Sequence, residues 1–214
     1  MEGSRLIEPA SKRQQRAAAT SEQLLNAARE VFETRGYAGT TVGAITETAN
    51  TAHGTFYLYF KNKEDAFGRV MEQVTHEMYE EASSSWHGDA REALYRANLR
   101  YLEVFERHRG LWRCLLEGMH RSQAVEQMWL ELRRPFFERI ARTLSRLVDQ
   151  GVVRKMDTTM AAHALGSMAE WFAFTYVVLG EPPHEDRSLD RIATTISDLW
   201  YHAVYASVPD PGQD

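Results

Sequence analysis

The sequence predicts an all-α protein of about nine helices, with an N-terminal three-helix unit followed by a larger C-terminal helical body. Apolar residues recur at three- and four-residue spacing along most of the 214 residues, which is the pattern of amphipathic helices. No segment alternates apolar and polar residues as a half-buried strand does, and no Gly-Asn hairpin signal competes. We therefore expect a series of helices joined by short turns.

The first helix is expected to follow a flexible basic arm formed by residues 1–19. Thr20 and Gln23 have the spacing of a capping box, in which two side chains bind backbone N–H groups at the start of a helix. An apolar stripe at helical spacing comes next: Leu24, Leu25, Ala28, Val31 and Phe32. Gly36 is expected to end this helix, because glycine readily takes the left-handed conformation found after helices.

A helix-turn-helix is predicted for residues 36–63, which read GYAGTTVGAITETANTAHGTFYLYFKNK. Thr40 and Thr41 can cap a short helix, and Asn50 after it tolerates the left-handed conformation of a sharp turn. The inward face of this helix is expected to be Val42, Ile45 and Ala49. A second short helix should then start near residue 52 or 53 and end near residue 59 or 60.

The second short helix offers side chains suited to DNA. Phe56 and Phe60 are four residues apart and can pack inward, so for them we accept the ordinary role of core aromatics. The other faces carry His53, Thr55, Leu58 and Tyr59. Small, polar and aromatic side chains on a short helix suit the major groove, while hydroxyls and amines at its edges suit phosphate oxygens. For His53 alone, base contact and simple solvent exposure are equal alternatives.

Asn62 is a plausible cap for the next helix, which would place Lys63 in its first turn. The backbone N–H groups and the positive end of the helix dipole favour a phosphate at that position. The combination of capping threonines, an asparagine turn and two nearby lysines favours DNA binding over a purely structural role for the segment.

The residues GTFYLYFKNKEDAF, preceded by TTVGAI and a turn, resemble the signature of the TetR family of transcriptional repressors. The match covers residues 21–70, and outside it only the length and the helical pattern agree. This resemblance implies a homodimer that binds a palindromic, double-stranded operator DNA and releases it when a small molecule enters the C-terminal domain. It places Thr41, Tyr57 and Lys63 at phosphate-contacting positions, with His53, Thr55 and Leu58 facing bases. The whole expected DNA-binding set is Thr40, Thr41, Thr51, His53, Gly54, Thr55, Tyr57, Leu58, Tyr59, Lys61 and Lys63.

The turn departs from the family pattern. Where the family commonly has Ala-Gly-Val-Ser, this chain has Ala49, Asn50, Thr51 and Ala52, so the usual serine cap of the recognition helix is missing. Thr51 is the alternative cap and would shift the start of the helix by one residue, whereas an absent cap would cost about 1 kcal/mol. The register of the DNA contacts therefore stays open.

Charge is unevenly distributed along the chain. Residues 1–63 hold 8 Lys and Arg against 6 Asp and Glu, whereas the remaining residues hold 17 against 24. Because the body is acidic, DNA affinity should come from a small basic footprint and fall steeply with salt. The arm, with its cluster of Lys12, Arg13 and Arg16, is either a solvated tail or a segment that follows the DNA backbone or minor groove.

The body should begin with a helix that starts at the DNA-binding end and links it to the rest. Its stripe is Phe67, Val70, Met71, Val74 and Met78, and it should end near the serines at 83–85. Further helices are expected to stop near Gly110, near Met119 and near Gly151, the last with a kink or break at Pro135. The predicted division is 20–65 for DNA binding, 66–208 for effector binding and dimerisation, and 209–214 as a tail.

The last two helices are predicted to form an association surface. Residues 158–179 are apolar around most of the helix, and their small side chains permit close helix approach. A symmetric four-helix interface would cover the faces not used by the core, and a helix-turn-helix needs two fixed copies to read two half-sites. The expected interface residues are Ala164, Ser167, Trp171, Thr175, Ile192, Ile196, Leu199, Trp200 and Ala203.

Large adaptable side chains in the body suggest an apolar cavity for an elongated, lipophilic effector, although any single one of them is more often plain core. The expected pocket residues are Met78, Phe105, Trp112, Met119, His120, Trp129, Phe137, Glu170, Trp171 and Phe174.

Other functions are disfavoured by what the sequence contains. The single Cys114 excludes an intrachain disulfide and suits a reducing cytoplasm, and no histidine pattern indicates a metal site, so we expect no cofactor and no enzyme. The longest apolar run, residues 171–179, is too short to cross a bilayer, and we expect no membrane or export signal. The alternatives are an all-α enzyme or small-molecule-binding protein without a DNA role, and a protein-binding adaptor. A salt-dependent shift with promoter DNA would distinguish a repressor from each of them.

Overall fold

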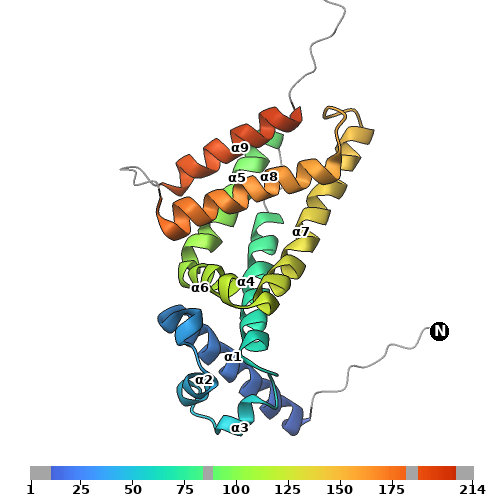
Figure 1. Cartoon of the computed structure of the whole chain (residues 1–214). Helices are drawn as coiled ribbons and strands as arrows, with labels where there is room; N and C mark the ends of the chain where they lie inside the picture. The colour runs from blue at the N-terminus through green and yellow to red at the C-terminus, as the bar shows by residue number, and fades with distance from the viewer. Residues whose placement is uncertain (1–10, 84–88, 182–187, 206–214) are drawn as a thin grey trace, which may run out of the picture.

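The structure, a computed structural model, describes residues 11–83, 89–181 and 188–205. The expected all-α fold is confirmed: these residues form helices throughout and no strands. Figure 1 shows α1–α3 as a small unit at one end and α5–α9 as a larger body, with α4 running between them. The helices are α1 Lys12–Gly39, α2 Val42–Thr48, α3 His53–Phe56, α4 Lys63–Ser83, α5 Ala90–Arg107, α6 Arg109–Arg121, α7 Gln123–Asp149, α8 Thr158–Phe172, the π-helical η1 Ala173–Leu179 and α9 Leu189–Tyr205.

Helix α1 begins at Lys12, so the helix start expected at Thr20 is wrong. Its capping box is Ser11 with Gln14: the Ser11 hydroxyl accepts from the Gln14 N–H at 3.3 Å, and Gln14 Oε1 accepts from the Ser11 N–H at 2.8 Å. Residues 12–19 are therefore the first turns of a helix and no part of a flexible arm, while residues 1–10 lie outside the described residues. The helix extends this far because the sequence after the cap is rich in Ala, Lys, Arg and Gln, which have high helix propensity.

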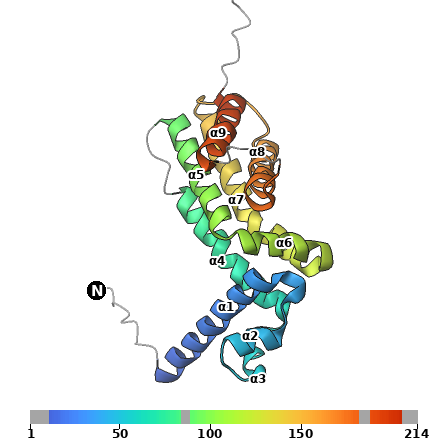
Figure 2. The same ribbon diagram turned by 90° about the vertical axis from the view of Figure 1, so that its left-hand side faces the viewer.

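The path of α1 bends at Gly36. Its φ of 69° and ψ of 179° belong to a region open essentially to glycine, and the chain then resumes a helical course to Gly39. The bend leaves the N–H groups of Tyr37 and Ala38 facing α6, where Glu117 accepts both, at 2.9 and 3.3 Å. In Figure 2, α6 lies across the end of α1, so this carboxylate ties the small unit to the body.

Helix α4 is the structural link between the two units. It packs on α1 at its start and on α5 and α7 further along. Its expected stripe is confirmed, because these five residues are all buried: Phe67, Val70, Met71, Val74 and Met78. They belong to one apolar cluster that runs from Leu24 in α1 to Trp200 in α9, so the units share a continuous core.

Helix α7 passes through Pro135 without a break, contrary to the break offered as one alternative. Pro135 itself is exposed, and the two residues after it are anchored by packing. Phe136 stacks on Tyr79 with ring centroids 4.8 Å apart, and Phe137 stacks on His163 at the same separation. Proline removes one helical hydrogen bond, and contacts on both neighbouring helices are sufficient to keep the segment helical.

Candidate DNA-binding surface and ligand cavity

The first helix of the DNA-binding motif, α2, is fixed by its threonine cap and its apolar face. The Thr41 hydroxyl accepts from the Ala44 N–H at 3.1 Å, as expected for an N-cap. Ile45 is fully buried beneath it. Thr40 is a correction: it is buried, and its hydroxyl donates to the Gly36 carbonyl at 2.7 Å, so it stabilises the bend and is not positioned to contact DNA.

The turn between α2 and α3 has the predicted left-handed residue. Asn50 has a φ of 49°, and the Ala49 carbonyl before it accepts from Gln23 Nε2 of α1 at 2.7 Å. The proposed cap by Thr51 is wrong, because α3 starts after Ala52 with no side-chain cap. Thr51 Oγ1 is buried and has no hydrogen-bond partner among the described residues, so it is not placed for a phosphate contact either.

Helix α3 is a single turn, shorter than expected, followed by hydrogen-bonded turns to Phe60. Phe56 and Phe60 are buried, with ring centroids 5.2 Å apart, and they hold the turn against α1 and α2. The opposite face is open to solvent, with Tyr57 55% and Leu58 79% exposed. The remaining expected contacts divide into exposed His53, Gly54 and Lys61 and half-buried Thr55 and Tyr59.

Asn62 caps α4, since its Oδ1 accepts from the Asp65 N–H at 2.8 Å. The phosphate contact expected for Lys63 stays a prediction, and in this structure the side chain is engaged within the protein. Its ammonium donates to the Tyr37 carbonyl at 3.0 Å and lies 4.2 Å from the centroid of the Tyr37 ring. The same tyrosine donates its hydroxyl to Glu64 at 2.8 Å, and burial, reinforced by this carboxylate, raises the pKa of the Tyr37 phenol. Lys63 therefore fastens α4 to the bend after α1.

Figure 1 shows α8 and α9 next to each other on one side of the body, and both expose apolar side chains among polar ones. Met160, Ala164 and Trp171 of α8 and Leu199 of α9 are exposed. Three of the expected interface residues instead lie inside the subunit: Ile192, Ile196 and Trp200. They face the core because α9 packs on α5, a partner that the stripe alone does not identify. The other expected residues, Ser167, Thr175 and Ala203, are half-buried.

The rings expected to line an aromatic pocket instead pack against one another in the described part of the chain. Phe105 and Trp112 stack with centroids 4.1 Å apart, and Phe174 and Trp129 meet Trp112 edge-on at 5.8 and 5.6 Å. Met78 and Phe137 are also buried in packed surroundings, whereas His120 and Trp171 face solvent and Met119 is half-buried. None of the ten expected residues lines the cavity described next.

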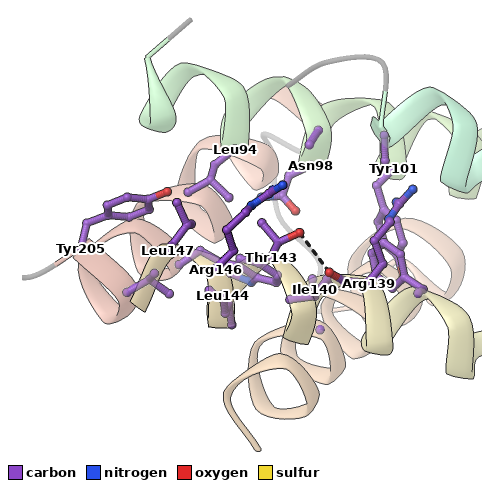
Figure 3. A pocket seen from close by; sticks show the side chains of 17 residues that line it. Leu94, Asn98, Tyr101, Arg139, Ile140, Thr143, Leu144, Arg146, Leu147 and Tyr205 are labelled. Carbon is purple, nitrogen blue, oxygen red and sulfur yellow. Dashed lines mark hydrogen bonds between the residues drawn. The ribbon is translucent and has the colours of Figure 1, made fainter. Parts of the chain in front are cut away.

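A cavity of about 430 Å³ lies between α5, α7, α8 and α9 (Figure 3). Its walls are mostly apolar, and its polar side chains come from α5, α7 and the end of α9. The lining residues are Ala82, Leu94, Ala97, Asn98, Tyr101, Phe136, Arg139, Ile140, Thr143, Leu144, Arg146, Leu147, Gly166, Ala169, Trp200, Val204 and Tyr205. The cavity residues on α7 recur at spacings of three and four. The spacing of Arg139, Thr143 and Arg146 could therefore have predicted that these polar residues share one face of the helix.

A buried ion pair lies between α7 and α8, near this cavity. Arg133 and Glu170 are 2.6 Å apart, and their side chains are only 21% and 12% exposed. Burial raises the pKa of Glu170 to about 7, and Arg133 opposes that shift without cancelling it. Arg133 also donates to Ser167 at 3.2 Å and lies 4.5 Å from the centroid of the Phe137 ring.

The single cysteine is not placed for catalysis. Cys114 is 1% exposed, and burial raises the pKa of its thiol, which keeps it protonated and unreactive. The nearby His108 hydrogen-bonds to Glu77 at 3.0 Å instead. Among the residues that the structure describes, no three His, Cys, Asp or Glu side chains gather to hold a metal ion, and no helix is long and apolar enough to cross a membrane.

Comparisons with known proteins agree with this architecture. Residues 24–70 match the sequence model of the bacterial regulatory proteins of the tetR family, and residues 92–206, more than half of the chain, match that of the AefR-like transcriptional repressor C-terminal domain. The uncharacterized HTH-type transcriptional regulator YhgD of Bacillus subtilis (strain 168) is 25% identical over 145 residues, which are 66% of this chain and 76% of that protein.

Solved structures show the same fold. A TetR-family transcriptional regulator from Mesorhizobium loti MAFF303099 superposes with a TM-score of 0.72 and 22% identity, covering 89% of this chain and 99% of that chain. A transcriptional regulator from Saccharomonospora viridis, solved in complex with choline, gives a TM-score of 0.68 at 18% identity, covering 89% of this chain and all of that one. The family expected from residues 21–70 is thus confirmed, and the chain belongs to the TetR family of transcriptional regulators.

Proposed function

We propose that this regulator is a ligand-responsive repressor that binds a palindromic operator as a homodimer. The observation that carries the proposal is the construction of α3 and the turn after it, where the exposed His53, Gly54, Tyr57 and Leu58 surround the buried anchor Phe56. A rigid, outward-facing turn with polar and aromatic side chains suits direct contact with base edges and phosphates. Lys61, exposed beside it, supplies positive charge for the DNA backbone.

Replacing Lys61 with alanine should weaken binding to all DNA sequences alike and reduce the salt slope by about 1, because one phosphate contact is lost. Replacing His53 should instead change preference at particular base pairs, by about 1–3 kcal/mol. Fragments selected from random DNA, followed by fluorescence anisotropy over a salt series, measure both effects.

Lys155→Ala is the matched control for these variants, since Lys155 is an exposed lysine in the loop before α8, away from α3. It should leave affinity and salt slope unchanged. Equal losses for Lys61→Ala and Lys155→Ala, or no salt-dependent binding to the chain's own promoter, would contradict the proposed docking.

A homodimer is supported by the exposed apolar face of α8 and α9. Trp171 of α8, at 60% exposed, and Leu199 of α9, at 53%, are large exposed hydrophobic side chains on the last helices, and exposed apolar patches mark association sites. Tryptophan is also a frequent energetic centre of protein interfaces. Trp171→Ser should therefore weaken the dimer about tenfold or more, as measured by sedimentation over a concentration series. Leu130→Ser, at a 48% exposed site on α7, is the control that should not change it. A Trp171 variant that dimerises normally would place the interface elsewhere.

Ligand response is supported by the reach of α4. This helix contributes Ala82 to the cavity wall at one end and Lys63 to the Tyr37 carbonyl at the other, about 30 Å away for a helix of 21 residues. A ligand that binds one arrangement of the cavity more tightly would thus favour one position of the DNA-binding unit α1–α3. The choline complex of the relative from Saccharomonospora viridis shows that this fold accommodates a small molecule.

A further inference from the structure

We infer that the cavity between α5, α7, α8 and α9 binds a single-chain amphiphile with an anionic head, held by Arg146 with Arg139 beside it. The inference builds on the proposed function, in which this cavity is the effector site. It adds the sign of the ligand's charge, the position of its head and its size.

The charges of the cavity wall have one sign. Its lining includes two arginines and, among the described residues, no aspartate or glutamate. Figure 3 shows both guanidinium groups rising from α7 on the same side, Arg146 towards Asn98 and Arg139 towards Tyr101. Two cations along one wall favour an anion and disfavour a cation by the same electrostatics. Guanidinium groups in addition match the two oxygens of a carboxylate.

The guanidinium of Arg146 is available to bind an anionic ligand. The neighbouring Arg142 on the same helix faces Glu138, with guanidinium and carboxylate 3.8 Å apart. The guanidinium of Arg146 makes no ion pair or hydrogen bond with any of the described residues, and this exposed side chain lines the cavity where it opens to solvent. The buried carboxylate of Glu170 is engaged by Arg133 and does not line the cavity. A cationic ligand would therefore meet two arginines and no carboxylate among the lining residues that the structure describes.

The inner part of the cavity is apolar and firmly placed. Its buried apolar side chains include Leu94, Leu144, Ala169, Trp200 and Val204, and the buried Tyr101 adds one hydroxyl. The two small polar residues are oriented by existing hydrogen bonds, since Asn98 donates to Ser197 at 2.9 Å and Thr143 donates to the Arg139 carbonyl at 3.0 Å. Charge at the mouth and hydrocarbon within match a molecule with a polar head and an apolar chain.

The volume sets the size of the ligand. At about 30 Å³ for each group of the size of a water molecule, a cavity of about 430 Å³ holds about 14 non-hydrogen atoms. A twelve-carbon carboxylate, dodecanoate, has about that number, and it is the probe that we choose. Dodecanol and dodecyltrimethylammonium carry the same chain with a neutral and a cationic head.

The experiment measures binding of the three probes to the full chain without DNA, by titration calorimetry below their micellar concentrations. Dodecanoate should bind about tenfold more tightly than dodecanol, and the ammonium compound most weakly. Arg146→Gln should remove most of the advantage of dodecanoate while leaving dodecanol affinity unchanged. Arg142→Gln, one turn away and outside the cavity, should change neither. Ala97→Phe, which places a ring in the cavity, should abolish binding of both probes while thermal denaturation reports that the protein stays folded.

Equal affinities for dodecanoate and dodecanol, tighter binding of the ammonium compound, or equal effects of Arg146→Gln and Arg142→Gln would overturn the anionic head site. Adding operator DNA in a second measurement separates this inference from the proposed function. If dodecanoate binds as expected but does not release DNA, the effector role fails and the site stands. If the chain binds operator but dodecanoate shows no preference over dodecanol, the inference alone fails.

Discussion

Phe56→Ala should reduce the free energy of unfolding by about 3–5 kcal/mol and abolish specific DNA binding. The side chain is fully buried, and its ring contacts Phe60 at 5.2 Å between centroids. Helix α3 has four residues, which is too short to be stable without tertiary packing. With the anchor removed, the exposed side chains lose their fixed orientation. Urea denaturation and anisotropy with operator DNA measure the two effects.

Tyr57→Ala is the matched control, because Tyr57 is the next residue in the chain and is 55% exposed. Its loss should change stability by less than about 0.5 kcal/mol while weakening DNA binding. Comparing the Phe56 and Tyr57 variants therefore distinguishes a residue that stabilises α3 from one that contacts DNA. A Phe56 variant with near-normal stability, or a Tyr57 variant as unstable as the Phe56 variant, would refute this division.

Arg133→Met should cost about 3–5 kcal/mol near pH 8, because it leaves the buried carboxylate of Glu170 without its cation. The loss should shrink towards pH 5. In the unfolded chain the carboxyl has its usual pKa of about 4.5, whereas burial raises the pKa of Glu170 in the folded protein to about 7. Below both pKa values Glu170 is protonated in both states and imposes no penalty. As the pH rises between these two pKa values, the folded state becomes less stable relative to the unfolded state. Without Arg133 the pKa of Glu170 in the folded protein is higher still, so the loss of stability continues to higher pH.

Urea denaturation at about pH 5 and about pH 8 tests this dependence. The double variant Arg133→Met with Glu170→Gln should recover most of the loss at the higher pH, because no charge is then buried alone. Glu170→Gln alone completes the double-mutant cycle, which gives the interaction energy between the two residues. The same loss for Arg133→Met at both pH values would show that the residue acts through packing on Phe137 and not through the charge of Glu170.

The sequence was most informative where structure is determined locally. The spacing of Phe56 and Phe60, the tolerance of Asn50 for positive φ and the caps by Thr41 and Asn62 all act within a few residues, and the structure has each of them. The start of α1 was missed for a related reason. Ser11 with Gln14 and Thr20 with Gln23 have the same capping spacing, and only the second precedes an apolar stripe. Residues 12–19 have high helix propensity but no apolar periodicity, and this propensity extends α1 to the capping pair of Ser11 and Gln14.

What the sequence did not reveal depends on contacts between distant segments. Lys63 was expected at a phosphate because its position in α4 is known locally, but the bend at Gly36 brings the Tyr37 carbonyl within 3.0 Å of it. The aromatic pocket failed similarly, since Phe105, Trp112 and Phe174 come from three helices and fill one another's space. Whether large side chains enclose a void depends on how helices meet, and composition carries no information about that.

The carboxylate of Glu117 has a consequence for engineering this regulator. The bend at Gly36 releases two backbone N–H groups, and the group that satisfies them belongs to α6, 79 and 80 residues further along the chain. In a hybrid repressor, residues 11–62 of this chain would be replaced by the DNA-binding unit of another protein. The two backbone N–H groups at the bend of that unit would still need an acidic side chain on α6 to accept them. DNA specificity is therefore transferable only together with this contact between the bend and α6.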